Sequence, residues 1–111
     1  MSNTHRSWQR FVAVRIPAAD APPMEPLVLP DAIVLIDRHY SSLAPYRPTR
    51  PNLYAVRQEA GLTVRYVELA ANCLVLRPRN FPFPVELIEI ASADSASELI
   101  TGRIAFIING L

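Results

Sequence analysis

The chain has 111 residues, half of them hydrophobic and 19% charged, a composition that excludes intrinsic disorder and suits one globular domain. Its net charge of +1 gives no bulk argument for nucleic-acid or membrane-surface binding, so we expect neither as a direct partner. No apolar run approaches the roughly 18 residues of a membrane span, and residues 1–10 lack the apolar core of a secretory signal. A cytoplasmic protein is therefore expected.

Proline divides the chain into short extended segments. The eleven prolines gather mainly over residues 17–30, 45–51 and 78–84, where a fixed φ and a missing amide hydrogen predict loops. The runs between them, rich in Val, Ile, Leu and aromatic residues, predict a mainly β domain over residues 11–111 after a flexible segment, residues 1–10. In chain order the expected strands are Phe11–Ile16, Ala32–Asp37, Leu53–Gln58, Leu62–Leu69, Cys73–Arg77, Val85–Ile90 and Ile100–Ile108, with a helical turn around Ser95–Ile100.

The third and fourth expected strands form a hairpin. They flank Glu59-Ala60-Gly61, a short loop whose glycine can adopt the positive φ that such turns require. Period-two alternation in the fourth strand places Arg65 on a mostly apolar face, beside Val67. The Arg65 guanidinium must find an acceptor there or reach solvent, because burying an unpaired charge is very unfavourable.

The last expected strand ends in Ile104-Ala105-Phe106-Ile107-Ile108, which is apolar on both faces. Such a strand lies either in the centre of a sheet or beneath another subunit. We therefore expect a homodimer formed through this C-terminal strand.

Five segments in chain order resemble the C-terminal domain of LexA-like repressors, the S24 peptidase family, whose fold is related to that of signal peptidases. In that family a Ser-Met-x-Pro loop precedes a Gly-Asp pair and an apolar strand, and a later strand reads Val-Lys-Arg. The corresponding segments here are Pro23-Met24-Glu25-Pro26, Pro30-Asp31 with Ala32–Asp37, Val64-Arg65-Tyr66-Val67, Leu76–Pro84 and Ile100–Phe106. The resemblance implies a LexA-like twisted β-sheet domain of about seven short strands, running from about Phe11 to the end.

The residues that carry the family's chemistry are replaced. The resemblance places the nucleophilic serine at Pro23, which has no hydroxyl, and the lysine base at Arg65. An arginine, with a pKa above about 12, does not act as a base in a protein. We therefore expect no catalytic residues and a non-enzymatic domain. Ala60-Gly61 matches the family's cleavage dipeptide, but it lies in the expected hairpin turn.

Other chemistry is weakly supported. His39 lies near Asp37, Ser41 and Ser42, but residues adjacent in sequence do not by themselves form a catalytic triad. Two histidines and one cysteine, Cys73, without paired spacing predict no metal site, and nothing predicts a cofactor.

Three functions remain open. The first is a catalytically inactive LexA-like domain that self-associates or binds a transcription-regulator partner, since no helix-turn-helix module is expected within these residues. The second is a peptidase with a relocated site. The third is a peptide- or small-ligand-binding module that uses the family's substrate cleft, with Arg65 paired to Glu25, to Asp20 or to a ligand carboxylate. The candidate ligand-binding residues are Met24, Glu25, Arg65, Arg77 and Arg79.

Overall fold

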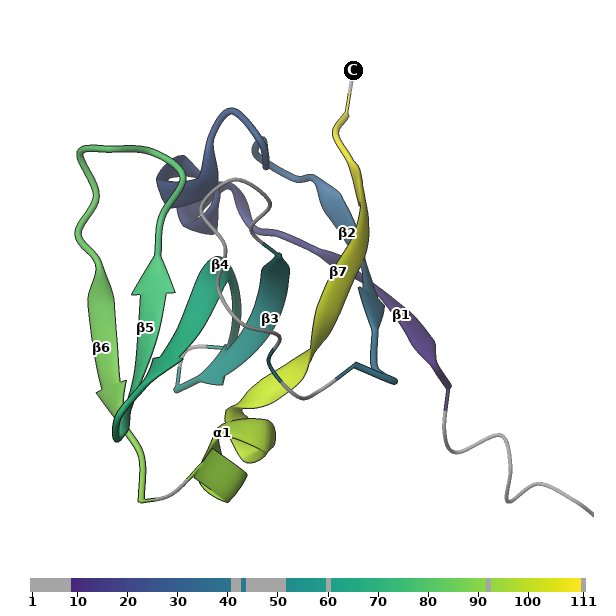
Figure 1. Ribbon diagram of the computed structural model, residues 1–111. Helices are drawn as coiled ribbons and strands as arrows, with labels where there is room; N and C mark the ends of the chain where they lie inside the picture. The colour runs from purple at the N-terminus through teal and green to yellow at the C-terminus, as the bar shows by residue number, and fades with distance from the viewer. Residues whose placement is uncertain (1–8, 41–42, 44–51, 60, 92, 111) are drawn as a thin grey trace, which may run out of the picture.

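The computed structural model of the chain describes residues 9–40, 43, 52–59, 61–91 and 93–110. Seven antiparallel strands form one twisted sheet in the order β1-β2-β7-β3-β4-β5-β6 (Figure 1). The predicted mainly β class and all seven predicted strands are confirmed. The strands are β1 (Phe11–Arg15), β2 (Ile33–Asp37), β3 (Leu53–Gln58), β4 (Gly61–Ala70), β5 (Cys73–Arg77), β6 (Glu86–Glu89) and β7 (Ile100–Ile108).

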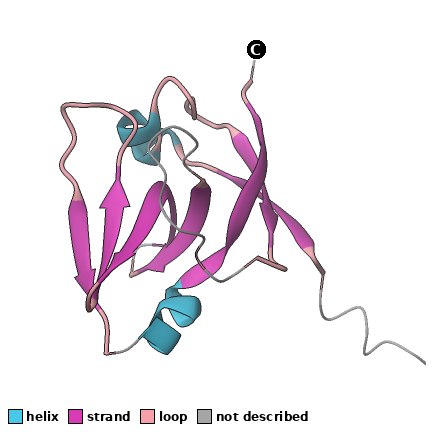
Figure 2. Cartoon of the chain, viewed as in Figure 1, coloured by secondary structure: helices cyan, strands magenta, loops and turns pink. Residues whose placement is uncertain are grey.

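Helical structure is confined to short segments at opposite ends of the sheet (Figure 2). The 3-10 turns η2 (Ala18–Asp20) and η3 (Pro22–Met24) lie in the connection between β1 and β2. The helical turn expected around Ser95–Ile100 is α1 (Ala93–Leu99), which leads directly into β7. No helix in the described part of the chain has the length and apolarity needed to cross a membrane.

The β3–β4 hairpin forms as predicted. Gln58 pairs with Gly61 at the end of the ladder. Gly61 has a φ of 130°, a backbone conformation that residues other than glycine rarely adopt. Alternation along β4 then directs Val64 and Val67 to two different clusters of buried residues. This alternation fixes the face on which Arg65 lies.

Two apolar cores occupy the two faces of the sheet, because alternate residues of β3 enter different cores. Ala55 belongs to the first core, whereas Tyr54 and Val56 belong to the second. The first core consists of Ile16, Met24, Val28, Ala32, Val34, Ile36, Ala55 and Val64. The second core consists of Tyr54, Val56, Val67, Leu74, Leu76, Ile90, Ala96 and Ile100. β3 is thus buried on both faces and forms the centre of the fold.

Strand β7 changes partner along its length. Its residues 100–103 pair with β3 and residues 103–108 pair with β2, so Arg103 has a cross-strand partner on both sides in the described part of the chain. Register shifts leave Thr101 and Ala105 without a cross-strand partner, and such bulges increase the local twist. β7 therefore turns away from β3 beyond Arg103.

Gly102 allows β7 to approach β2 at this point. A Cβ atom added to Gly102 would lie 2.5 Å from the carbonyl oxygen of Asp37 and 2.8 Å from Cγ2 of Ile36. The first of these neighbours is backbone and cannot rotate away. The close approach of the two strands therefore requires the absence of a side chain at Gly102.

We predict that Gly102→Ala destabilises the fold by about 3 kcal/mol, because overpacking forces the β2 and β7 backbones apart. Urea unfolding monitored by circular dichroism measures this loss. Gly110→Ala is the matched control, since an added Cβ there meets no atom within 4 Å. It should change the free energy of unfolding by less than about 0.5 kcal/mol. Equal stability of the two variants would contradict the steric role of Gly102.

Candidate functional site

The loop that the family resemblance singles out is held against a second loop. The carbonyl oxygen of Pro23 accepts hydrogen bonds from the backbone N–H groups of Arg79 (2.9 Å) and Asn80 (2.8 Å). The Asn80 side-chain Nδ2 also donates to the carbonyl oxygen of Pro22, at 3.0 Å. These bonds join the β1–β2 connection to the β5–β6 connection, segments almost 60 residues apart in sequence. The structure thus brings together two of the five matched segments.

Met24 and Glu25 follow Pro23 in this loop but differ in accessibility. Met24 is only 1% exposed and packs in the first core with Val28 and Ile16. Its flexible thioether fills space between the loop and the sheet. Glu25 is half-buried. A ligand at the surface would therefore meet Glu25 but would not reach Met24 in this arrangement.

Arg65 is buried in β4, with 8% of its surface exposed. Its Nη1 donates to the carbonyl oxygen of Val64 at 2.7 Å, and its Nη2 lies 3.7 Å from Oε2 of Glu86 in β6. Burial lowers the pKa of Arg65, while the negative charges of Glu86 and Asp20 oppose this effect. The guanidinium nevertheless stays protonated at neutral pH. Arg65 pairs with Glu86 rather than with Glu25 or Asp20, the partners expected from sequence.

Arg77 and Arg79 do not join Arg65 in one site. Arg77 lies directly across from Tyr66 in the β4–β5 ladder, so it is on the opposite face of the sheet from Arg65. Its Nη2 lies 2.7 Å from Oε1 of Glu68. Arg79 is exposed in the β5–β6 connection. The residues proposed from sequence as ligand-binding are therefore spread over both faces, and their binding role stays a prediction.

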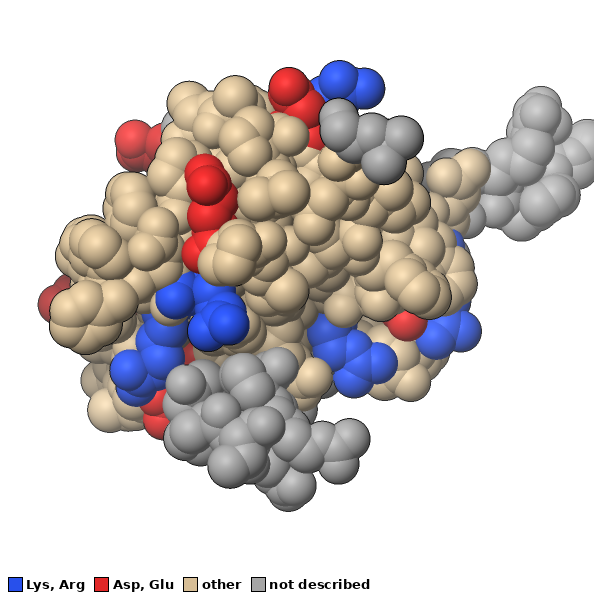
Figure 3. All heavy atoms as spheres, turned by 90° about the horizontal axis from the view of Figure 1, so that it is seen from above, with Lys and Arg blue, Asp and Glu red and all other residues tan. Residues whose placement is uncertain are grey.

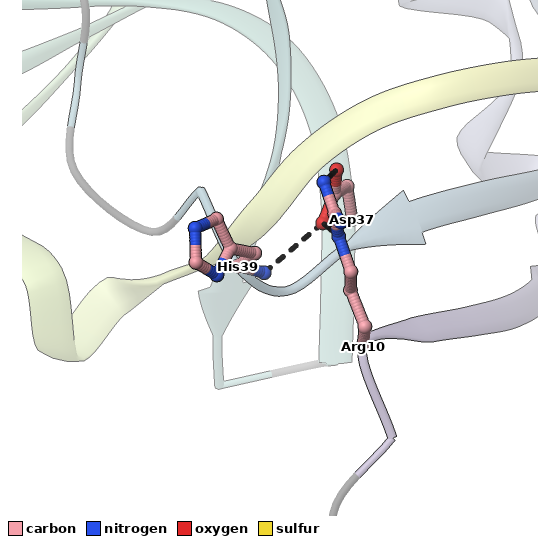
Figure 4. Close-up of polar contacts among 3 residues, drawn as sticks. All are labelled: Arg10, Asp37 and His39. Atoms are coloured by element: carbon pink, nitrogen blue, oxygen red, sulfur yellow. Dashed lines mark hydrogen bonds and ion pairs between the residues drawn. The ribbon is translucent and has the colours of Figure 1, made fainter.

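The Ser-His-Asp combination near the end of β2 is organised around an ion pair (Figure 4). Arg10 donates from Nε and Nη2 to the two carboxylate oxygens of Asp37, each at 3.0 Å. His39 donates to Asp37 through its backbone N–H at 3.1 Å. Ser41 and Ser42 lie outside the described residues. Asp37 thus binds a guanidinium and a backbone amide, which is not the carboxylate–imidazole bond of a catalytic triad.

This ion pair also alters the expected organisation of the N-terminus. Residues 1–8, most of the segment expected to be flexible, lie outside the described residues. Arg10, however, is fixed to β2 by two charge-assisted hydrogen bonds to a carboxylate that is only 4% exposed. The hydrogen bonds from Arg10 hold the pKa of Asp37 below its usual range. Arg10, at the end of the expected flexible segment, is therefore bound to the sheet, and the division of the chain at residue 10 stays a prediction.

Sequence reasoning did not anticipate a hollow beside the C-terminal half of β7. The hollow has a volume of about 340 Å³. Asn109 fixes one side of it, because its Oδ1 accepts from the N–H of Leu29 (2.9 Å) and its Nδ2 donates to the carbonyl of Leu27 (3.3 Å). The doubly apolar pattern of residues 104–108 was the only sequence signal for this surface. The residues that line the hollow are Leu27, Asn52, Leu53, Tyr66, Ile104, Ala105, Phe106 and Ile107.

No protein-family model matches the chain, and no curated protein matches it either. Among the described residues, no group of three or more His, Cys, Asp or Glu side chains is arranged to hold a metal ion. The LexA-like resemblance therefore depends on the five sequence motifs alone and stays a prediction.

We predict that the Arg10–Asp37 pair makes stability depend on pH below about pH 4. Because the pKa of Asp37 is lowered in the folded state, its contribution is present above the unfolded pKa of about 3.9 and is lost as pH falls through the folded value. Asp37→Asn should lower the midpoint of urea unfolding at pH 6 and flatten its dependence on pH below about pH 4.

Asp31→Asn is the matched control, because Asp31 is an exposed aspartate with a φ of 63° that asparagine also tolerates. This variant should keep both the midpoint at pH 6 and the acid dependence of the parent protein. If the urea midpoint of Asp37→Asn fell with decreasing pH as steeply as that of Asp31→Asn, Asp37 would not be the source of the pH dependence.

Proposed function

We propose that this domain is a non-catalytic, LexA-like association module that pairs with a second copy of itself, or with a transcription-regulator partner, through residues 104–108 of β7. The observation that carries the proposal is the exposure of apolar side chains on this half-strand. Phe106 is 67% exposed and Ile108 is 60% exposed. Exposed apolar residues that adjoin one another favour an interaction surface.

Neighbouring strands extend this apolar surface. Phe106 lies across from Leu35, and Ile108 lies across from Ile33, so the four side chains share the outer face of the β2–β7 ladder. Ala13 of β1 continues the same face beside Leu35, and the exposed Arg15 borders it across from Ile33. Figure 3 shows the molecule from above, where uncharged residues, polar ones included, cover most of the surface between separate charged groups. An apolar face of this kind suits burial against another apolar surface.

The backbone of β7 supports the same mode of association. Beyond Arg103, the edge of β7 that faces away from β2 has no strand paired to it in the described part of the chain. Unpaired edges of this kind readily add a strand from another chain. Two copies related by a two-fold axis would present the same residues to each other, and a net charge of +1 adds little repulsion.

Two replacements support the absence of peptidase chemistry in this proposal. Pro23 supplies no hydroxyl, and its carbonyl oxygen is engaged by two backbone amides. Arg65 is buried and ion-paired with Glu86, and a guanidinium does not accept a proton at physiological pH. Neither side chain can take the role of nucleophile or general base in this arrangement.

The hollow beside β7 favours a second candidate function, the binding of an extended peptide or a small ligand. Leu27 and Tyr66, two of its lining residues, directly follow Pro26 and Arg65, which border the substrate cleft implied by the family resemblance. A volume of about 340 Å³ is at the lower limit for a small-molecule site. Ligand binding in the hollow would leave the chain monomeric, whereas strand pairing would not.

We predict that Phe106→Glu weakens self-association at least tenfold, because it places a charge in the centre of a buried apolar interface. Sedimentation equilibrium of the parent and the variant at micromolar concentrations measures the dissociation constants. Leu87→Glu is the matched control: Leu87 is also 67% exposed but lies on β6, at the far edge of the sheet. A parent protein that stays monomeric at high micromolar concentration, or an equal loss with Leu87→Glu, would exclude this interface.

The peptidase alternative has a separate test. LexA-like domains cleave themselves at alkaline pH, when the lysine base loses its proton, and Arg65 does not lose its proton near pH 10. The intact mass of the chain should therefore stay unchanged after prolonged incubation near pH 10. A defined fragment pair in the mass spectrum would indicate a nucleophile at another position.

A further inference from the structure

A row of alternating guanidinium groups and aromatic rings lies across the ends of β1, β2 and the middle of β7. The Cζ atom of Arg10 lies 5.0 Å from the ring centroid of Phe11 and 5.8 Å from that of Tyr40. The Cζ atom of Arg103, a residue of β7, lies 4.2 Å from the ring centroid of Tyr40. His39 meets Tyr40 edge-on, with 5.1 Å between centroids. We call these five residues the Arg–aromatic cluster.

The two large rings of the cluster are accessible. Phe11 is 44% exposed and Tyr40 is 40% exposed, although aromatic side chains of this size are usually buried. Cation–π contacts hold both rings in place, so a ligand that stacks on them would meet a largely ordered surface. The packing of the fold does not by itself explain why these two rings remain at the surface.

The two arginines of the cluster have different electrostatic roles. Arg10 is neutralised by Asp37, which it holds through two hydrogen bonds of 3.0 Å. Arg103 forms no ion pair with a carboxylate among the described residues. Its guanidinium instead makes a cation–π contact with the ring of Tyr40. Its N–H donors therefore remain available to an anion. Guanidinium groups of this kind match the oxygens of a phosphate.

We propose that the Arg–aromatic cluster binds single-stranded nucleic acid. Bases stack on the exposed rings of Phe11 and Tyr40, and Arg103 binds a backbone phosphate. Exposed aromatic rings beside a positively charged side chain are the arrangement that recognises single strands without sequence preference. The net charge of +1 is an average over the chain and does not describe this region, where Asp37 is ion-paired with Arg10 and Arg103 has no carboxylate partner among the described residues.

This inference is independent of the self-association proposed above. Phe11 and Arg103 both lie across from Asp37, on the same face of the sheet as Leu35 and Phe106 but at the C-terminal end of β2, whereas Ile108 lies across from Ile33 at the other end. The two proposals are tested with different variants and different measurements, so they can fail separately.

The test is fluorescence anisotropy with a fluorescein-labelled twelve-residue oligothymidylate at low salt. Binding is expected with a dissociation constant of about 1–100 µM that rises with salt. Tyr40→Ala and Arg103→Gln should each weaken binding about tenfold, since they remove a stacking ring and a phosphate contact. Phe11→Ala removes the other stacking ring and should also weaken binding. Because Phe11 lies on the edge strand β1, this variant still tests the proposal if Tyr40→Ala fails to fold. Circular dichroism confirms that each variant is folded.

Two controls separate stacking from general charge attraction. Arg79→Gln removes an exposed arginine from a distant loop and should change affinity by less than twofold. An abasic oligomer of the same length keeps the phosphates but lacks the bases, and should bind about tenfold more weakly. The proposal is overturned by absence of binding at about 100 µM protein in low salt, by equal loss with Arg79→Gln, or by equal affinity for the abasic oligomer.

Discussion

The close approach of β7 to β2 at Gly102 is the constraint on which the rest of the sheet depends. At this residue β7 lies close to both neighbouring strands: an added Cβ would meet Asp37 and Ile36 of β2, and Ala55 of β3 lies across from Gly102 in the other ladder. Among the strands that the structure describes, β1 and β2 join β3–β6 only through β7. A side chain at Gly102 would therefore disturb the one ladder that makes the seven strands a single sheet.

The approach of β7 to β2 at Gly102 also separates a buried part of β7 from an exposed part. N-terminal to Arg103, β7 pairs with β3 and closes the second core through Ile100. C-terminal to Arg103, the bulge at Ala105 turns β7 away from β3. This turn opens the hollow and leaves Phe106 and Ile108 exposed. Residues 104–108 therefore do not take the central position, one of the two expected for them, in the described part of the chain, and their burial beneath another subunit stays a prediction.

The sequence predicted the strands well because their signals are local. Proline clusters, β-branched runs and one glycine turn fix seven strands and a hairpin without knowledge of the tertiary fold. Pairs that depend on distant segments were not predictable: Arg65 pairs with Glu86 across β5, and Arg10 pairs with Asp37 across 27 positions of sequence. Sequence alternation placed Arg65 on a buried face, but the strand order decides which carboxylate reaches it. The bulges of β7 have no sequence signal beyond Gly102.

The loop at the candidate site is held by two backbone amides that donate to the carbonyl oxygen of Pro23. Adjacent N–H donors directed at one oxygen are the arrangement that stabilises the oxyanion in acyl-transfer enzymes. Here the donors of Arg79 and Asn80 meet the carbonyl of Pro23 itself, at 2.9 and 2.8 Å, so they are occupied within the chain. Opening this contact would break two backbone hydrogen bonds, each of which contributes about 0.5–1.5 kcal/mol. The loops that would have to part around a substrate are therefore held together, which is consistent with a structural use of this region and with an interaction function located elsewhere on the sheet.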